Sequence, residues 1–158
     1  MSIPNRDLGV YLNESLDLDL QERKRKPHKL EIFIDMCCPF CKKIMTTILS
    51  KDCELIKKYS KDVEIVLHPI IQAWHPQTIA IHEFFLAILL STDYDFKAYR
   101  EFMAIYFENQ EEYFDNNSWD LDRFQIYAKL SKLASDIDGI DGDKILKEYL
   151  SKNQEAIK

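Results

Sequence analysis

Glycine is scarce in this sequence: three of the 158 residues are glycine and five are proline. A chain with so few turn-forming residues has few places for the tight reversals of an all-β fold, so we expect helices to dominate. Positive charge is also in the minority, because 21 Lys and Arg stand against 27 Asp and Glu, for a net charge of −6. Binding to nucleic acid or to an anionic membrane surface needs a basic face, so we expect neither partner.

A long uninterrupted apolar segment is missing as well. The most apolar stretch, residues 79–90, contains His82 and Glu83, whereas a membrane-spanning helix needs about 20 apolar residues. The N-terminus has no apolar core behind a basic start, so it lacks the pattern of a signal peptide. We therefore expect a cytoplasmic protein whose thiols are kept reduced. The basic run from Arg23 to Lys26 leaves nuclear import as a weaker alternative.

The length fits one domain with a sizeable core. Residues 1–28 are predicted to form a polar N-terminal arm, which carries one short apolar patch at residues 8–12. Residues 29–158 are predicted to form the folded domain. We find no internal repeat and no low-complexity tract.

Two strands and a helix are predicted at the start of the domain. Apolar and polar side chains alternate over residues 30–36, which is the period of a β-strand, and residues 63–67 predict a second strand that stops at His68. Between them the apolar side chains repeat at helical spacing behind Pro39, a residue that suits the first turn of a helix. Residues 55–59 continue or restart this helix. Such a βαβ unit has parallel strands and a right-handed crossover.

The remainder is predicted to be helical. Residues 75–91 are apolar nearly all round and should be buried, and an aromatic stripe at helical spacing follows over residues 96–107. We expect Ser118 to cap the next helix and Asp143 to cap the last one. The residues of the next helix expected to face the core are Leu121, Phe124, Ala128 and Leu130.

Cys38 and Cys41 form a Cys-x-x-Cys pair where the predicted strand turns into the predicted helix. Unpaired N–H groups and the positive end of the helix dipole surround a sulfur at a helix N-terminus, and they lower the pKa of such thiols to about 3.5–7.5. We expect Cys38 to act as the nucleophile in disulfide exchange, and Cys41, one turn deeper, to resolve the mixed disulfide. An inherited but inactive dithiol and half of a metal site are the alternatives.

A zinc site needs two further ligands at a suitable spacing. The remaining cysteines are Cys37, which adjoins the pair, and Cys53, so we expect neither a metal nor another cofactor. Cys37 is expected to be the last strand residue, packed beside the motif, and Cys53 to be an incidental thiol at a helix end. His68 and His82 are expected to be structural, with His82 hydrogen-bonded in the core.

A second group of residues is expected near the dithiol. Parallel strands end at the same edge of a sheet, so Trp74 and His75, which follow the second strand, should lie on the side of Cys38. Together with Pro39 and Phe40 they are our candidates for a substrate groove. The alternative is that Trp74 and His75 only begin a helix.

Residues 30–43, LEIFIDMCCPFCKK, closely resemble the active-site segment of the DsbA-like thioredoxin-fold family. Residues 72–77, QAWHPQ, followed by His82 and Glu83, resemble a segment of uncharacterised eukaryotic members of this group. The resemblance covers about residues 28–158. It implies an α/β thioredoxin-like fold, in which the Cys-x-x-Cys pair lies at the strand-to-helix turn of the βαβ unit. A DsbA-like all-helical insertion is then expected at about residues 75–137.

This resemblance implies a thiol–disulfide oxidoreductase whose substrate is a protein or glutathione thiol or disulfide. A non-catalytic thioredoxin-like binding module with an incomplete site is the alternative. A glutathione-dependent transferase or isomerase of related fold is weaker, because such relatives usually carry Ser in place of the nucleophilic Cys38.

The sequence departs from the family at its C-terminal end. The family fold closes with an antiparallel hairpin that begins with a cis-proline facing the dithiol, but here no proline follows Pro76. No strand alternation follows Asp143 either. We therefore expect the chain as given to be incomplete as a catalyst. We also expect an open edge on the strand at residues 30–36, which favours self-association.

Overall fold

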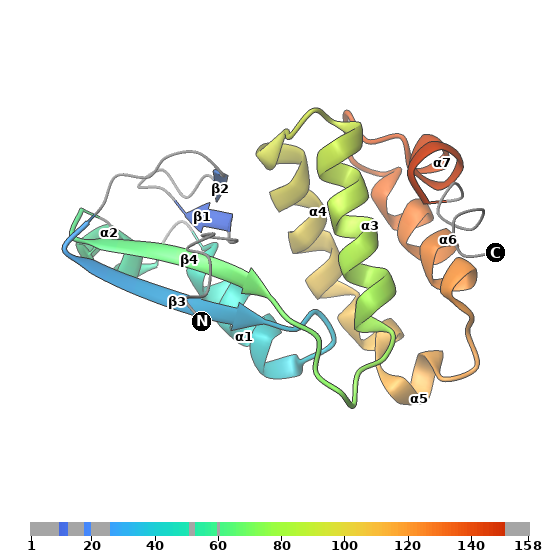
Figure 1. The fold of residues 1–158 in the computed structure, drawn as a ribbon, viewed down its shortest axis with the longest axis horizontal. Helices are drawn as coiled ribbons and strands as arrows, with labels where there is room; N and C mark the ends of the chain where they lie inside the picture. Colours follow the sequence, from blue (N-terminus) through green and yellow to red (C-terminus); the bar gives the residue numbers. More distant parts are fainter. Residues whose placement is uncertain (1–9, 13–17, 20–25, 51–52, 60, 151–158) are drawn as a thin grey trace, which may run out of the picture.

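The computed structural model describes residues 10–12, 18–19, 26–50, 53–59 and 61–150, and the fold below concerns these residues. They form a four-stranded sheet beside a group of helices (Figure 1). In chain order the elements are β1 (Val10–Leu12), β2 (Leu18–Asp19), β3 (His28–Ile34), α1 (Pro39–Ile48), α2 (Glu54–Tyr59), β4 (Val63–Pro69), α3 (Thr78–Ser91), α4 (Phe96–Glu108), η1 (Gln110–Tyr113), α5 (Asp115–Ser118), α6 (Arg123–Ala134), α7 (Gly142–Lys144) and η2 (Ile145–Leu150).

The strand order in the sheet is β2-β1-β4-β3. β3 and β4 are parallel, with Leu30 opposite Ile65, so the predicted βαβ unit is confirmed. The strand boundaries differ slightly from the prediction. β3 ends at Ile34, because the chain turns there towards α1, and β4 continues through His68 to Pro69.

Part of the N-terminal arm joins the sheet. β1 lies within the predicted apolar patch and pairs antiparallel with β4, and β2 pairs antiparallel with β1. β1 is therefore on the side of β4 opposite to β3, and β3 is an edge strand of the described sheet. The division of the chain at residue 29 stays a prediction.

The core lies between one face of the sheet and the helices. Side chains alternate between the two faces of a strand, so Ile34 of β3 shares a face with Ile65 and Leu67 of β4. These three residues belong to the same buried cluster as Met45 and Ile48 of α1. Two of the apolar positions that predicted α1, Met45 and Ile48, thus belong to this core, whereas Ile44 is exposed.

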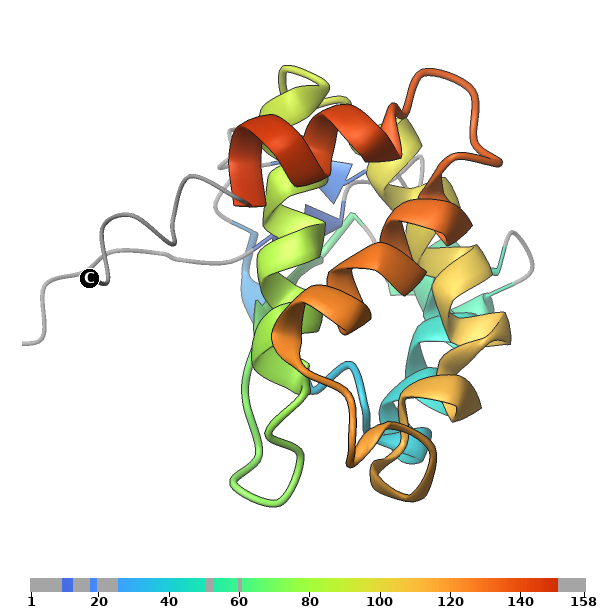
Figure 2. The ribbon, with the colours of Figure 1, turned by 90° about the vertical axis from the view of Figure 1, so that its right-hand side faces the viewer.

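The helix α3 is the centre of the helical part. It packs against α4 and α6, and η2, red in Figure 2, lies across one end of it. Phe85 of α3 packs against Phe102 of α4 with tilted rings whose centroids are 4.8 Å apart, and Tyr106 meets the Phe85 ring edge-on. The predicted burial of α3 is confirmed for most of its residues, although Ile79, Leu86 and Leu90 are exposed. The predicted aromatic stripe of α4 is confirmed. Every helix among the described residues is too short or too polar to cross a bilayer.

Two predicted helix caps are wrong. The cap of α6 is Asp122 instead of Ser118, because Asp122 and Gln125 form a reciprocal capping box. Ser118 is buried at the end of α5, where its hydroxyl donates to the carbonyl of Tyr113 at 3.1 Å. The last helix is capped by Asp141 instead of Asp143.

The shift of the α6 start also changes which side chains face the core. Phe124 and Ala128 are exposed, contrary to the prediction, and Leu121 is only partly buried. Leu130 is buried as expected. The residues of α6 that are buried are Ile126, Tyr127, Leu130, Ser131 and Ala134.

Gly142 allows α7 to approach α6 closely. A Cβ at this position would lie 2.6 Å from the Ser131 hydroxyl oxygen, with the Ser131 carbonyl oxygen closer still. We expect Gly142→Ala to lower the free energy of unfolding by about 1–3 kcal/mol, as overpacked sites do. Urea denaturation measures this loss. Asp143→Ala, on the exposed side of the same turn, is the control, and equal losses in the two variants would contradict the prediction.

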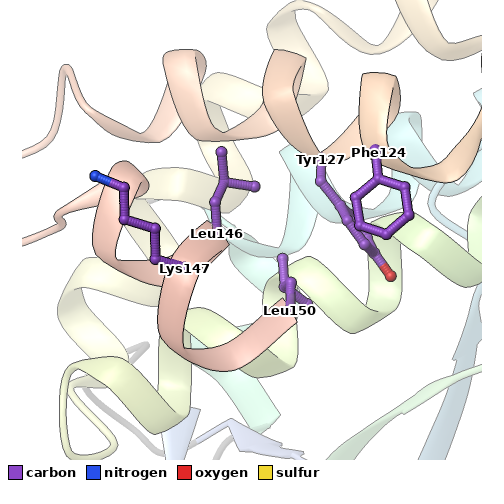
Figure 3. A pocket seen from close by; sticks show the side chains of 5 residues that line it. All are labelled: Phe124, Tyr127, Leu146, Lys147 and Leu150. Atoms are coloured by element: carbon purple, nitrogen blue, oxygen red, sulfur yellow. The ribbon is translucent and has the colours of Figure 1, made fainter. Parts of the chain in front are cut away.

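A hollow of about 380 Å³ opens between α6 and η2 (Figure 3). Phe124 and Tyr127 line it from α6, and Leu146, Lys147 and Leu150 line it from η2. The Tyr127 hydroxyl donates to Glu83 of α3. None of the predicted site residues lines this hollow, so it is separate from the dithiol.

Candidate dithiol site

Cys38 is the N-cap residue of α1. Its backbone is extended, with φ −80° and ψ 120°, and Pro39 occupies the first helical position as predicted. The Cys38 amide donates to the Asp35 carbonyl at 3.1 Å, and the Cys38 carbonyl accepts from Lys42 at 3.2 Å. The Cys38 side chain makes no capping hydrogen bond. Its sulfur therefore lies at the N-terminal end of the helix without being used to cap it.

The two thiols of the motif differ in exposure. Cys38 is half-buried, whereas Cys41 is buried one turn further along α1. Burial raises the pKa of Cys41 to about 11, and the neighbouring Cys38 thiol adds to the rise. The Asp35 amide acts in the opposite direction by donating to the Cys41 sulfur at 3.4 Å. The arrangement is an accessible thiol in front of a protected one.

The other two cysteines are shielded. Cys37 is 1% exposed, and its sulfur donates to the Tyr113 carbonyl at 3.6 Å. Burial raises the pKa of Cys37 to about 12. It is packed beside the motif as expected, although in the turn rather than at the strand end. Cys53 is buried directly before α2.

Asp35 is a functional candidate that the strand pattern did not reveal. It is fully buried and accepts four hydrogen bonds. The donors are the amides of Cys37 and Gln72 at 2.8 Å each, the Thr78 hydroxyl at 2.9 Å and Nδ1 of His75 at 3.2 Å. Four donors around one group suit a carboxylate, since a carboxylic acid would need an acceptor. The sequence feature that could have identified Asp35 is the presence of an acidic residue inside an otherwise apolar segment.

The Asp35 carboxylate joins the dithiol turn to the loop between β4 and α3. Through it His75 is held beside the turn, which confirms that this loop lies at the Cys38 end of the sheet. Trp74 meets the His75 ring edge-on and is 66% exposed. Phe40 is 75% exposed on the first turn of α1, behind the exposed Pro39. A substrate groove formed by these residues stays a prediction.

Gln110 holds the dithiol turn from the opposite side. Its side-chain amide donates to the Met36 carbonyl at 2.6 Å and to the Cys38 carbonyl at 3.0 Å. The Tyr106 hydroxyl also donates to Met36, at 3.0 Å. Oε1 of Gln110 is buried and has no hydrogen-bond partner among the described residues. No local sequence pattern predicts this contact, because its partners are more than 70 residues apart.

Two other histidines, His68 and His82, lie on β4 and α3. His82 Nε2 contacts the Ile70 carbonyl at 2.9 Å, and burial lowers the pKa of His82. The expected hydrogen bond of His82 is thus confirmed, although the residue is only partly buried. His68 stacks on Phe33 and lies 3.0 Å from the Glu31 carboxylate. Among the described residues, no three His, Cys, Asp or Glu side chains are grouped so that they could hold a metal ion.

We expect the protein to lose stability in alkaline solution. Burial raises the pKa of Cys37 from 9.0 to about 12, and it also raises the pKa values of Tyr99 and Tyr113. The folded protein holds these protons more tightly, so the free energy of unfolding is highest below pH 9 and falls as the pH rises towards the folded-state pKa values. Each group contributes up to about 1.4 kcal/mol per pH unit within its window.

Urea denaturation at a series of pH values between 8 and 11 measures this alkaline loss of stability. Cys37→Ala should show a shallower decline than the unaltered chain, since it removes the titrating thiol. A free energy of unfolding that stays constant over this range would contradict the prediction.

The α/β topology, the parallel β3–β4 pair and the dithiol at the start of α1 define a thioredoxin-like fold with an all-helical insertion. No family model matches the chain, and no curated protein matches it. Its structure is similar to the crystal structure of a proposed protein-disulfide isomerase from Pseudomonas syringae. The TM-score is 0.59 over 84% of this chain and 71% of that chain, with 18% sequence identity. The predicted fold class is thus confirmed. The eukaryotic subgroup and the missing hairpin stay predictions.

Proposed function

We propose that this protein is a thiol–disulfide oxidoreductase in which Cys38 is the nucleophile and Cys41 the resolving thiol. The observation that carries the proposal is the half-buried Cys38 at the N-cap of α1 with the buried Cys41 one turn behind it. Helix N-termini favour the thiolate form of cysteine. The thioredoxin-like fold supports the same reaction class.

In the proposed reaction the Cys38 thiolate attacks one sulfur of a substrate disulfide. The substrate S–S bond breaks, a mixed disulfide with Cys38 forms, and the leaving thiolate takes up a proton. The Cys41 thiolate then attacks the Cys38 sulfur and releases the second substrate thiol. The substrate gains two electrons, and the protein is left with a Cys38–Cys41 disulfide. An external dithiol or two glutathione molecules return it to the reduced form.

Asp35 and Gln110 act as positioning residues in this reaction. Asp35 fixes the turn before Cys38 through the Cys37 amide and places its own amide against the Cys41 sulfur. Gln110 fixes the Cys38 carbonyl. Neither side chain contacts the reacting sulfur of Cys38, so their contribution is the geometry of the two thiols.

Disulfide exchange with oxidised glutathione and with a disulfide-linked peptide tests the proposal, with dithiothreitol as the electron source. The reduced chain and its Cys53→Ser variant should both turn over, and Cys38→Ser should not. If the unaltered chain is as slow as Cys38→Ser while remaining folded, the protein is instead a non-catalytic thioredoxin-like binding module.

Trp74 is proposed to contact the substrate. We expect Trp74→Ala to slow exchange with the disulfide-linked peptide several-fold, because a large aromatic surface beside the dithiol turn is lost, and to leave the thermal midpoint nearly unchanged. Trp119→Ala is the matched control, since Trp119 is 80% exposed on the segment between α5 and α6. Equal exchange rates in the two variants would assign Trp74 no part in substrate binding.

A further inference from the structure

β3, the first strand of the βαβ unit, is an edge strand of the described sheet, and most of its residues are exposed. In the described sheet β4 is its neighbour on one side, and β3 forms the lower edge of the sheet in Figure 1. Leu30 is 37% exposed and Phe33 is 57% exposed. A strand edge with apolar side chains is a template for pairing with another strand.

The hydrogen bonds at the two ends of β3 show which backbone groups face this edge. The His28 amide donates towards β4, to the Asp62 carbonyl at 3.1 Å, and the Ile34 carbonyl accepts from Ile70 on the same side at 2.9 Å. Successive residues of a strand direct their N–H and C=O groups to opposite sides. The N–H and C=O groups of Lys29, Glu31 and Phe33 therefore point to the open edge.

The charges along this edge are self-complementary. Lys29 and Glu31 flank Leu30, so a second copy of β3 running antiparallel, with Leu30 opposite Leu30, places each Lys29 opposite a Glu31. Within one chain the Glu31 carboxylate also contacts Lys29 at 2.9 Å and His68 at 3.0 Å. These contacts hold it at the surface of the sheet beside the open edge.

The neighbouring registers that also bring outward backbone groups face to face are less favourable. A pair centred on Glu31 sets two carboxylates directly opposite each other, which destabilises a strand pair. A pair centred on Ile32 sets each Glu31 opposite Phe33 and leaves the Lys29 side chains without a cross-strand partner in the second copy. In the register centred on Leu30, Lys29 meets Glu31 on both sides of the two-fold axis and the two Leu30 side chains face each other.

We propose that this protein forms a two-fold symmetric dimer in which β3 pairs antiparallel with β3 of a second copy in the register centred on Leu30. The four-stranded sheets of the two copies then form one continuous sheet, and the interface is isologous, as in most homodimers. The proposal does not depend on the proposed catalysis. The Cys38 turns follow the far ends of two strands that run in opposite directions, so both dithiols stay outside the interface.

Sedimentation velocity of the full reduced chain, from about 1 μM to 1 mM, tests the dimer. The unaltered chain should shift from monomer to dimer as the concentration rises. Lys29→Glu and Glu31→Lys should each weaken the dimer at least about tenfold, because each replaces two attractive cross-strand pairs by two repulsive ones. Lys43→Glu, an exposed charge change on α1, is the control and should dimerise like the unaltered chain.

Two combinations make the test specific for the register. An equimolar mixture of Lys29→Glu and Glu31→Lys chains should form a heterodimer, because one copy then presents two acids and the other two lysines. The double variant Lys29→Glu/Glu31→Lys should recover the homodimer. Circular dichroism verifies that every variant is folded.

Three results would overturn the proposal. One is an unaltered chain that stays monomeric at every concentration, which leaves the edge to a segment of the same chain or to a strand of another protein. A second is a dimer that neither single charge reversal weakens. The third is a mixture of the two single variants that remains monomeric.

Discussion

Replacing Cys41 by Ser is expected to trap the protein in a stable mixed disulfide through Cys38. A serine hydroxyl cannot attack the Cys38 sulfur at neutral pH, so the second half of the exchange stops. The other thiols cannot easily replace the Cys41 thiol in the resolving step. Cys37 is fully buried with its pKa raised to about 12, and Cys53 is buried before α2.

The trap is measured by intact-protein mass spectrometry after exposure to oxidised glutathione and removal of the excess. Cys41→Ser should carry one glutathione adduct on nearly every chain, whereas the unaltered protein should return to an internal disulfide with little adduct. The double variant Cys38→Ser/Cys41→Ser is the matched control and should carry almost none. An adduct located on Cys37 would contradict the assignment of Cys38 as the nucleophile.

Asp35→Ala is expected to cause the largest loss of stability of the single substitutions considered. It removes the acceptor of four hydrogen bonds at a fully buried position and leaves the donors of Cys37, Gln72 and Thr78 without a partner. Removing one partner of a buried charged network costs about 3–5 kcal/mol. Urea denaturation of the reduced chain measures the loss.

The variant Asp35→Asn separates the contribution of the negative charge of Asp35 to stability from that of its side-chain shape. The amide keeps one oxygen for the donors that converge on Oδ1, but its NH₂ group then meets the Gln72 amide, so two donors face each other. We expect a loss smaller than that of Asp35→Ala but above about 1 kcal/mol. Asp62→Ala, an exposed acid between α2 and β4, serves as the control. A loss under 1 kcal/mol for both Asp35 variants would show that the network adds little to stability.

Sequence patterns predict those features of this structure that depend on residues close together in the sequence. Strand alternation over residues 30–36 and the change to helical spacing after Pro39 locate β3, α1 and the dithiol between them. The N-cap of α6 shows where prediction from single residues fails. Ser118 and Asp122 are both good N-cap residues, and the capping box with Gln125 decides for the second.

The site residues beyond the motif depend on contacts that no local pattern encodes. Asp35 receives donors from the loop after β4, and Gln110 reaches the dithiol turn from the start of η1. An alternating pattern assigns Asp35 to the outer face of a strand, whereas the strand ends one residue earlier and the side chain turns inward. Tertiary packing thus determines the surroundings of thiols whose positions were evident from the sequence.

The contacts of Tyr106, Gln110 and Tyr113 with the dithiol turn also bear on the order of folding. They join residues 70 to 76 positions apart, so they form only when the end of α4 and η1 dock against the sheet. Contacts of such high sequence separation close late, because the entropy of a long loop must be lost first. In the folded protein Cys37 is buried and its sulfur donates to the Tyr113 carbonyl, so we expect Cys37 to be accessible beside Cys38 and Cys41 before this docking. We expect this docking to withdraw Cys37 from disulfide formation, so that Cys38 and Cys41, the pair that the proposed reaction uses, remain the thiols open to oxidation.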